Sequence, residues 1–200
     1  MVRGRFGANS KPIGGSLGNY KHKLGFIHIP KCAGCSIGMY LQQLGNWHLV
    51  ETRSQKYAAE PFKNYPTYEL FTVIRHPISW IQSGFKMWKQ RRNYKLSFDE
   101  HVDKIIYNSQ SKSISENFDW DWHCSILPDE HIGNMKPKIF KMEELDKLKT
   151  YLIEYFPEAD NYSFKIENNT DPEIIEMSPA TMEKVKKFSK QYAEKFEYEL

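Results

Sequence analysis

The chain has 200 residues, of which 40% are hydrophobic and 14% aromatic. That content is enough to bury one sizeable core, and it excludes a disordered or fibrous protein. The 28 basic and 25 acidic residues give a formal net charge of +3, which is too even a balance for wrapping nucleic acid through bulk charge. We therefore expect a globular protein without a nucleic-acid partner, in which any anion site is local.

The first 23 residues hold five glycines and scattered basic residues without a hydrophobic period. They predict a flexible basic arm over 1–23, followed by a single domain over 24–200. No signal peptide or membrane span is visible in the sequence, so no membrane partner is expected. The three cysteines are too few for a disulfide framework and fit a reducing, cytoplasmic setting.

The chain from residue 24 onward alternates strand and helix patterns. The apolar run LGFIHI at 24–29 predicts a buried strand, PKCAGCS at 30–36 a tight turn, and IGMYLQQL at 37–44 a helix. WHLV at 47–50 and LFTVI at 70–74 predict two further strands. The second of these is followed at once by an arginine, a histidine and a proline, which end the strand.

The second half of the chain continues this alternation. The further predicted elements are a helix after Pro77, a helix starting at the capping box of Ser97 and Glu100, a strand at 138–142, a helix over 145–156, and a helix opened by Ser178 and Pro179. Such an order predicts a three-layer α/β/α domain with a central, mainly parallel sheet. Ligands of these sheets bind at the carboxyl ends of the strands.

The turn at residues 30–36, which we call the anion loop, has small residues where a backbone would approach an anion. The start of the following helix would offer N–H groups and a partial positive charge, and Lys31 adds a full charge. The loop lacks the first glycine of the G-x-x-x-x-G-K-[ST] pattern and carries its lysine near its start. An ordinary ATP or GTP site is therefore disfavoured.

The stretch FIHIPKCAGCSI at 26–37 resembles the 5′-phosphosulfate loop of the sulfotransferases, in particular the carbohydrate type, whose members read F-x-H-x-P-K-[TC]-[AG]-G-T-S. That family also has a strand ending in R-x-P, with a serine eight residues after the arginine. The segment FTVIRHPISWIQSGF supplies Arg75, Pro77 and Ser83 in this register. The resemblance runs from about residue 24 to the C-terminus and is dense only in these two motifs.

This resemblance implies a P-loop-like sulfotransferase fold that binds 3′-phosphoadenosine 5′-phosphosulfate and releases 3′-phosphoadenosine 5′-phosphate. It implies that Arg75 and Ser83 bind the 3′-phosphate, while the 5′-phosphosulfate is bound by Lys31, Cys32, Ala33, Gly34, Cys35, Ser36 and Ile37. Arg75 offers a fork of donors to a phosphate, which suits this role. The sequence departs from the family at Cys35, where threonine is usual, and at Trp80, where a second basic residue is common.

Sulfuryl transfer is an in-line displacement in which the protein positions the reactants and neutralises the leaving phosphate. Lys31 suits the second task, and no metal is required. A general base is needed beside the acceptor hydroxyl. Related enzymes carry it after the second strand, which indicates His48 or Glu51, and His123 is the third candidate. His28, inside a predicted strand, is read as a core histidine.

The acceptor is expected to be a hydroxyl-bearing small molecule or a glycan. Flat aromatic rings stack on sugars, and Trp88, Trp120 and Trp122 are candidates for such contacts or for the core. Two other functions stay open. One is a non-catalytic module that binds the same nucleotide, and the other is a thiol oxidoreductase using the C-x-x-C of Cys32 and Cys35.

Overall fold

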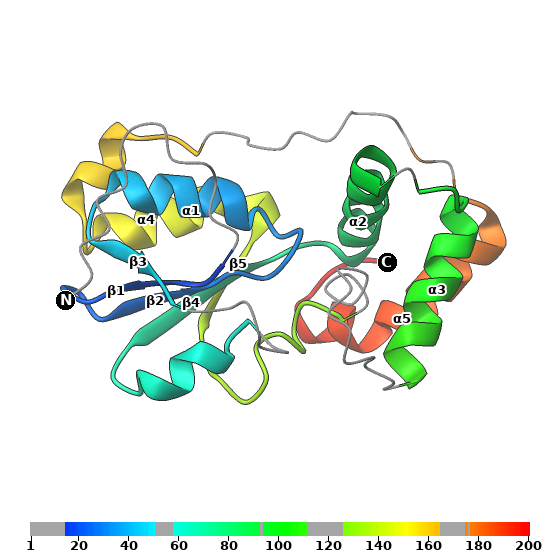
Figure 1. The fold of residues 1–200 in the computed structure, drawn as a ribbon, viewed down its shortest axis with the longest axis horizontal. Helices are drawn as coiled ribbons and strands as arrows, with labels where there is room; N and C mark the ends of the chain where they lie inside the picture. The colour runs from blue at the N-terminus through cyan, green and yellow to red at the C-terminus, as the bar shows by residue number, and fades with distance from the viewer. Residues whose placement is uncertain (1–14, 51–57, 93, 112–125, 165–174, 176) are drawn as a thin grey trace. The chain divides into compact units, whose positions relative to one another are not determined.

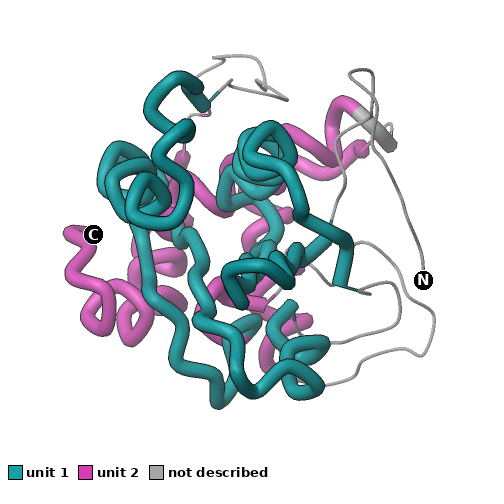
Figure 2. The backbone as a smooth tube through the Cα atoms, turned by 90° about the vertical axis from the view of Figure 1, so that its left-hand side faces the viewer, with its two compact units in different colours: residues 1–74, 131–168 teal, residues 75–130, 169–200 magenta. Residues whose placement is uncertain are grey.

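The computed structural model describes residues 15–50, 58–92, 94–111, 126–164, 175 and 177–200. The chain divides into two compact units, which Figure 2 colours separately. Unit 1 comprises residues 1–74 and 131–168, and unit 2 comprises residues 75–130 and 169–200. The single domain expected over 24–200 stays a prediction.

Unit 1 contains a five-stranded sheet with the order β3-β1-β2-β4-β5. The strands are β1 (Leu17–Asn19), β2 (Leu24–Ile27), β3 (Trp47–Leu49), β4 (Glu69–Ile74) and β5 (Lys138–Lys141). β2 pairs with β4, and β4 with β5, in parallel, whereas β1 is antiparallel to both β2 and β3. β3 therefore runs in the direction of β2, β4 and β5. The predicted α/β class and mainly parallel sheet are confirmed.

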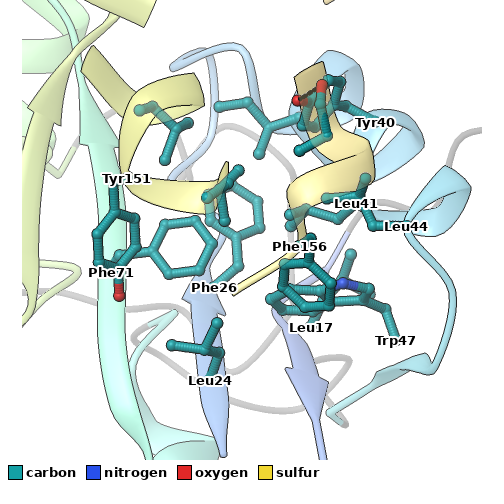
Figure 3. Close-up of a cluster of buried hydrophobic side chains, with 14 of the residues drawn as sticks. Leu17, Leu24, Phe26, Tyr40, Leu41, Leu44, Trp47, Phe71, Tyr151 and Phe156 are labelled. Carbon is teal, nitrogen blue, oxygen red and sulfur yellow. Dashed lines mark hydrogen bonds between the residues drawn. The ribbon is translucent and has the colours of Figure 1, made fainter. Parts of the chain in front are cut away.

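One face of this sheet is covered by the helices α1 (Gly34–Gln43) and α4 (Leu145–Ile153), as Figure 1 shows. The side chains that alternate along β2 and β4 supply the core on this face (Figure 3). Burial of each large apolar side chain stabilises the unit by about 1.5–3 kcal/mol. The fully buried members include Leu17, Leu24, Phe71, Ile37, Leu41, Leu148 and Leu152.

The other face of β2 is contacted by the short 3₁₀ helix η1 (Glu60–Asn64). A Cβ added to Gly25 would lie 2.5 Å from Cε1 of Phe62, so the phenyl ring packs directly on the glycine. Any larger residue at this position would push η1 away from the sheet. Phe62 is accordingly buried, with 1% of its surface exposed.

The expected flexible arm over 1–23 is wrong for its last part. Leu17–Asn19 form β1, which is inserted between β2 and β3 with every residue buried. A strand of three residues with one apolar side chain has no period that sequence patterns could reveal. Residues 1–14 lie outside the described part of the chain.

The predicted helix over 145–156 ends early, because α4 stops at Ile153. Phe156 precedes a proline, and a proline disfavours the helical conformation of the residue before it. Phe156 accordingly has φ −134° and ψ 84°, and η4 (Pro157–Asn161) follows. A further short helix, η3 (Met142–Glu144), joins β5 to α4.

Unit 2 contains α2 (Pro77–Arg92), α3 (Phe98–Ser111) and α5 (Pro179–Lys195). The predicted capping box of α3 is confirmed, since the Ser97 N–H donates to the Glu100 carboxylate at 2.7 Å and the Glu100 N–H to Ser97 Oγ at 3.3 Å. Ser178 caps α5 as predicted, by accepting from the Thr181 N–H at 3.2 Å. Both helix starts are therefore held by side chains.

Candidate anion-binding site

The anion loop follows the carboxyl end of β2. β2 and β4 are parallel neighbours, with Ile27 opposite Thr72, so both strands end at the same edge of the sheet. The chain then makes a turn in which the Cys32 N–H donates to the carbonyl of Ile29 at 3.3 Å, and α1 begins at Gly34. This is the strand-to-helix junction that the sequence predicts.

Two residues of the loop have left-handed backbone conformations. Lys31 has φ 65°, and Ala33 has φ 58° with ψ 13°. For residues other than glycine this conformation costs roughly 1–2 kcal/mol each. Backbone strain of this kind is common where a loop is shaped for a ligand, and left-handed residues next to a helix start turn successive N–H groups toward one point. This conformation was not predicted from the sequence, because neither residue is a glycine.

The N-terminus of α1 carries no side-chain cap at Ala33, and its first turn has no acidic residue. First-turn N–H groups point along the helix axis toward the preceding loop, where the helix dipole favours negative charge. The lysine of the loop lies just ahead of this turn and is half-buried. The arrangement fits a phosphate or sulfate group, whose oxygens accept several N–H donors at once.

The predicted cofactor-binding residues of the loop differ in burial and in hydrogen bonding. Cys32 is buried and Cys35 is half-buried, and neither forms a disulfide with a described residue. Ser36 is 8% exposed, in the first turn of α1. The Ile37 N–H donates to the Ala33 carbonyl at 3.0 Å, so this amide is engaged within α1. We therefore remove Ile37 from the predicted anion donors, because the helix ladder already takes its N–H group.

Close packing explains the glycine at the start of α1. A Cβ added to Gly34 would stand 1.8 Å from Cδ2 and 2.0 Å from Nε2 of His28. The imidazole therefore lies directly on the first residue of the helix. The same ring accepts a hydrogen bond at Nδ1 from the Gly15 N–H, at 2.8 Å. His28 was predicted to be a core histidine, with no connection to the anion loop.

The second motif lies at the junction of β4 and α2. The carbonyl of Arg75 accepts a hydrogen bond from the Tyr192 hydroxyl of α5 at 2.8 Å, which fixes the backbone at this point. Ser83 is 7% exposed, on α2, and Trp80 is 1% exposed. The departure from the family pattern at Trp80 thus places a core side chain in unit 2. The hydroxyl of Tyr192 was missed, because its position fits the apolar face of α5.

Lys31 belongs to unit 1, whereas Arg75 and Ser83 belong to unit 2. Their convergence on one nucleotide stays a prediction.

His48, a predicted general base, lies on β3 with its ring stacked on Tyr20, at a centroid distance of 3.6 Å and an interplanar angle of 2°. Tyr20 is in the turn between β1 and β2, at the sheet edge opposite the anion loop. Neither ring nitrogen of His48 has a hydrogen-bond partner among the described residues. Burial lowers the pKa of His48 from its ordinary value of 6.5, so the ring is neutral at pH 7.

The other base candidates, Glu51 and His123, lie outside the described residues, as do Trp120 and Trp122. Trp88 is 6% exposed and belongs to the buried face of α2 with Ile81 and Phe85. No group of three or more metal-ligating side chains occurs within the described residues. Within the same residues, no helix is both long and apolar enough to cross a bilayer.

Comparisons with known proteins gave one structural match. No protein-family model matches the sequence, and no curated protein matches it. The fold is similar to the crystal structure of a sulfotransferase from Alicyclobacillus acidocaldarius, with 15% sequence identity and a TM-score of 0.42. The match covers 72% of this chain and 60% of that protein, so this chain spans less than two thirds of the matched protein's length.

Proposed function

We propose that this protein is a sulfotransferase that moves the sulfuryl group of 3′-phosphoadenosine 5′-phosphosulfate to a hydroxyl of an acceptor. The acceptor that we propose is a carbohydrate. The observation that carries the proposal is the anion loop, in which left-handed Lys31 and Ala33 lead into a helix start without a side-chain cap. The loop follows a parallel strand at its carboxyl end, where ligands of such sheets bind. The sequence motif of the loop and the R-x-P motif after β4 supply the assignment to this nucleotide.

The proposed donor site has two ends. At one end, the first-turn amides of α1 and the ammonium of Lys31 bind the 5′-phosphosulfate. At the other end, Arg75 and Ser83 bind the 3′-phosphate. The hydrogen bond from Tyr192 to the Arg75 carbonyl supports this role, because it holds the arginine backbone in place for binding.

The nucleotide, when bound, supplies a sulfuryl group with a good leaving group. The acceptor oxygen forms a bond to sulfur, the bond from sulfur to the 5′-phosphate oxygen breaks, and the hydroxyl proton passes to a base. Lys31 stabilises the negative charge that develops on the 5′-phosphate. The loop amides hold the sulfur in line with the acceptor. No metal has a part in this scheme.

Of the three candidate bases, only His48 lies within the described residues. Its ring stacks on Tyr20, whose turn is at the sheet edge opposite the anion loop. This position disfavours His48, and Glu51 and His123 stay as the proposed alternatives.

Calorimetry with 3′-phosphoadenosine 5′-phosphate tests the donor site. Arg75→Ala should weaken binding by about 2–3 kcal/mol, because it leaves a charged phosphate without its partner. Lys31→Ala should chiefly lower turnover with the sulfated nucleotide. Lys89→Ala is the matched control, since it removes an exposed lysine of α2 and should change neither quantity.

ATP lacks the 3′-phosphate, and equal affinity for ATP would count against the proposal. Tight binding of the nucleotide without transfer to any hydroxyl acceptor would leave a non-catalytic binding module instead.

A further inference from the structure

The contact between His28 and Gly34 bears on nucleotide binding as well as on packing. This inference rests on the proposed function. Cδ2 and Nε2 of the imidazole would lie within 2.0 Å of a Cβ on Gly34. Real Cβ atoms do not approach other atoms so closely, so the ring occupies the space that a side chain at position 34 would need. The ring thus limits where the first turn of α1 can lie.

The ring is itself held from several sides. Its Nδ1 accepts from the Gly15 N–H at 2.8 Å, and the backbone N–H of His28 donates to Ser16 Oγ at 3.1 Å. Ser16 is fully buried, and its hydroxyl donates to the Ala58 carbonyl at 2.8 Å. The ring also lies nearly parallel to Phe26, at a centroid distance of 6.1 Å and an angle of 15°. These contacts hold His28 against the residues just before β1 and against β2.

The hydrogen bond at Nδ1 also sets the tautomer. Because Nδ1 accepts a hydrogen bond from the Gly15 N–H, the ring proton of the neutral imidazole is on Nε2. Nε2 is one of the two atoms nearest to the position that a Cβ on Gly34 would take. The N–H side of the ring thus faces the first residue of α1, where the proposed 5′-phosphosulfate binds.

We propose that His28 is a positioning residue for sulfate-donor binding. The imidazole, anchored through Nδ1, presses on Gly34 and fixes the first-turn amides of α1 in the position that the 5′-phosphate group requires. On this account Gly34 is a glycine to admit the ring, and not only to let an anion approach. Left-handed Ala33 immediately precedes Gly34 in the chain, which leaves the helix start little freedom to relax.

The first test replaces the two residues of the contact with alanine, one at a time and together. Gly34→Ala should lower thermal stability and reduce affinity for 3′-phosphoadenosine 5′-phosphate at least tenfold, because the new methyl group collides with the imidazole. His28→Ala removes all three of the atoms nearest to that methyl group. The double variant His28→Ala, Gly34→Ala should therefore be more stable than Gly34→Ala alone. Equal stability of the double variant and Gly34→Ala would overturn the packing argument.

The second test asks whether the anchored ring acts on the 5′ end of the nucleotide. Asparagine and leucine have nearly the same shape, but only asparagine can accept the Gly15 N–H in place of Nδ1. His28→Asn should keep the affinity for 3′-phosphoadenosine 5′-phosphate within about threefold. His28→Leu should lose about tenfold, because leucine cannot accept the Gly15 N–H and is no longer anchored against the start of α1.

Adenosine 3′-phosphate, which lacks the 5′-phosphate, serves as the reference ligand in this second test. Both variants should bind it as the wild type does. Equal losses for both ligands, or equal affinities of the asparagine and leucine variants, would overturn the positioning role. A wild type that binds neither ligand would contradict the proposed function itself, and the stability comparison at Gly34 would still decide the packing argument.

Discussion

Helices α1 and α5 begin in opposite ways. At α5, Ser178 has an extended backbone, its hydroxyl accepts from the Thr181 N–H, and a proline fills the first helical position. At α1, the capping position is held by left-handed Ala33, with no side-chain cap. The first is the arrangement that stabilises a helix by about 1 kcal/mol. The second gives up that stabilisation and adds strain.

This difference indicates what each helix start is for. α5, like α3 with its capping box, has its terminal amides served by its own side chains. The start of α1 is shaped by a strained loop and by the ring of His28, which directly follows β2, and it faces the carboxyl edge of the sheet. Strain that persists beside a helix start is expected where a bound group repays it. The predictions below test this contrast.

The largest effect should come from placing a negative charge at the start of α1. Ala33→Asp should weaken binding of 3′-phosphoadenosine 5′-phosphate by about tenfold or more, because two negative charges would lie within a few ångströms of each other. Ala33→Asn is the control, since it has the same shape without the charge and accepts a left-handed backbone. Calorimetry on both variants measures the difference. Equal affinities would mean that the start of α1 is not the anion site.

A smaller effect is expected at the capped helix. Ser178→Ala should lower the free energy of unfolding by about 1 kcal/mol, through loss of the bond to the Thr181 N–H. Affinity for the nucleotide should not change. Ser163→Ala, which alters an exposed serine outside the helices, is the matched control in denaturant titrations. A loss of affinity in Ser178→Ala at unchanged stability would erase the contrast between the two helices.

The smallest effect should come from relieving the strain. Ala33→Gly should raise the free energy of unfolding by about 0.5 kcal/mol, because glycine adopts φ 58° without strain but makes the unfolded chain more flexible. Ala180→Gly, in the first turn of α5, should have the opposite sign. Denaturant titrations of the two variants decide the matter. Two changes of the same sign would show that Ala33 is not strained.

The sequence predicted the elements whose signals are local. Hydrophobic runs marked β2 and β4, and polar caps marked the starts of α3 and α5. The position of the anion loop could be predicted as well, because the loop is the segment between the predicted strand and the predicted helix. Periodicity and capping are properties of neighbouring residues, which is why they can be read without a structure.

Features that depend on distant contacts were not predictable. The left-handed conformation of Ala33 has no sequence marker, and Gly34 owes its identity to His28, six residues earlier and in a different element. Tyr192 reads as an apolar-face residue, yet its hydroxyl holds the carbonyl of Arg75, 117 residues away. The engagement of the Ile37 amide depended on where α1 begins, and element boundaries are the least certain part of sequence-based reasoning.

The insertion of β1 between β2 and β3 affects how this protein opens locally. In the described sheet, β3 is an edge strand that pairs with β1 alone. Segments near the start of a chain usually exchange their amide hydrogens quickly, because they fray. Leu17 and Gly18 should instead exchange as slowly as the central strand β2, since their release would detach β3 and expose the core beneath α1.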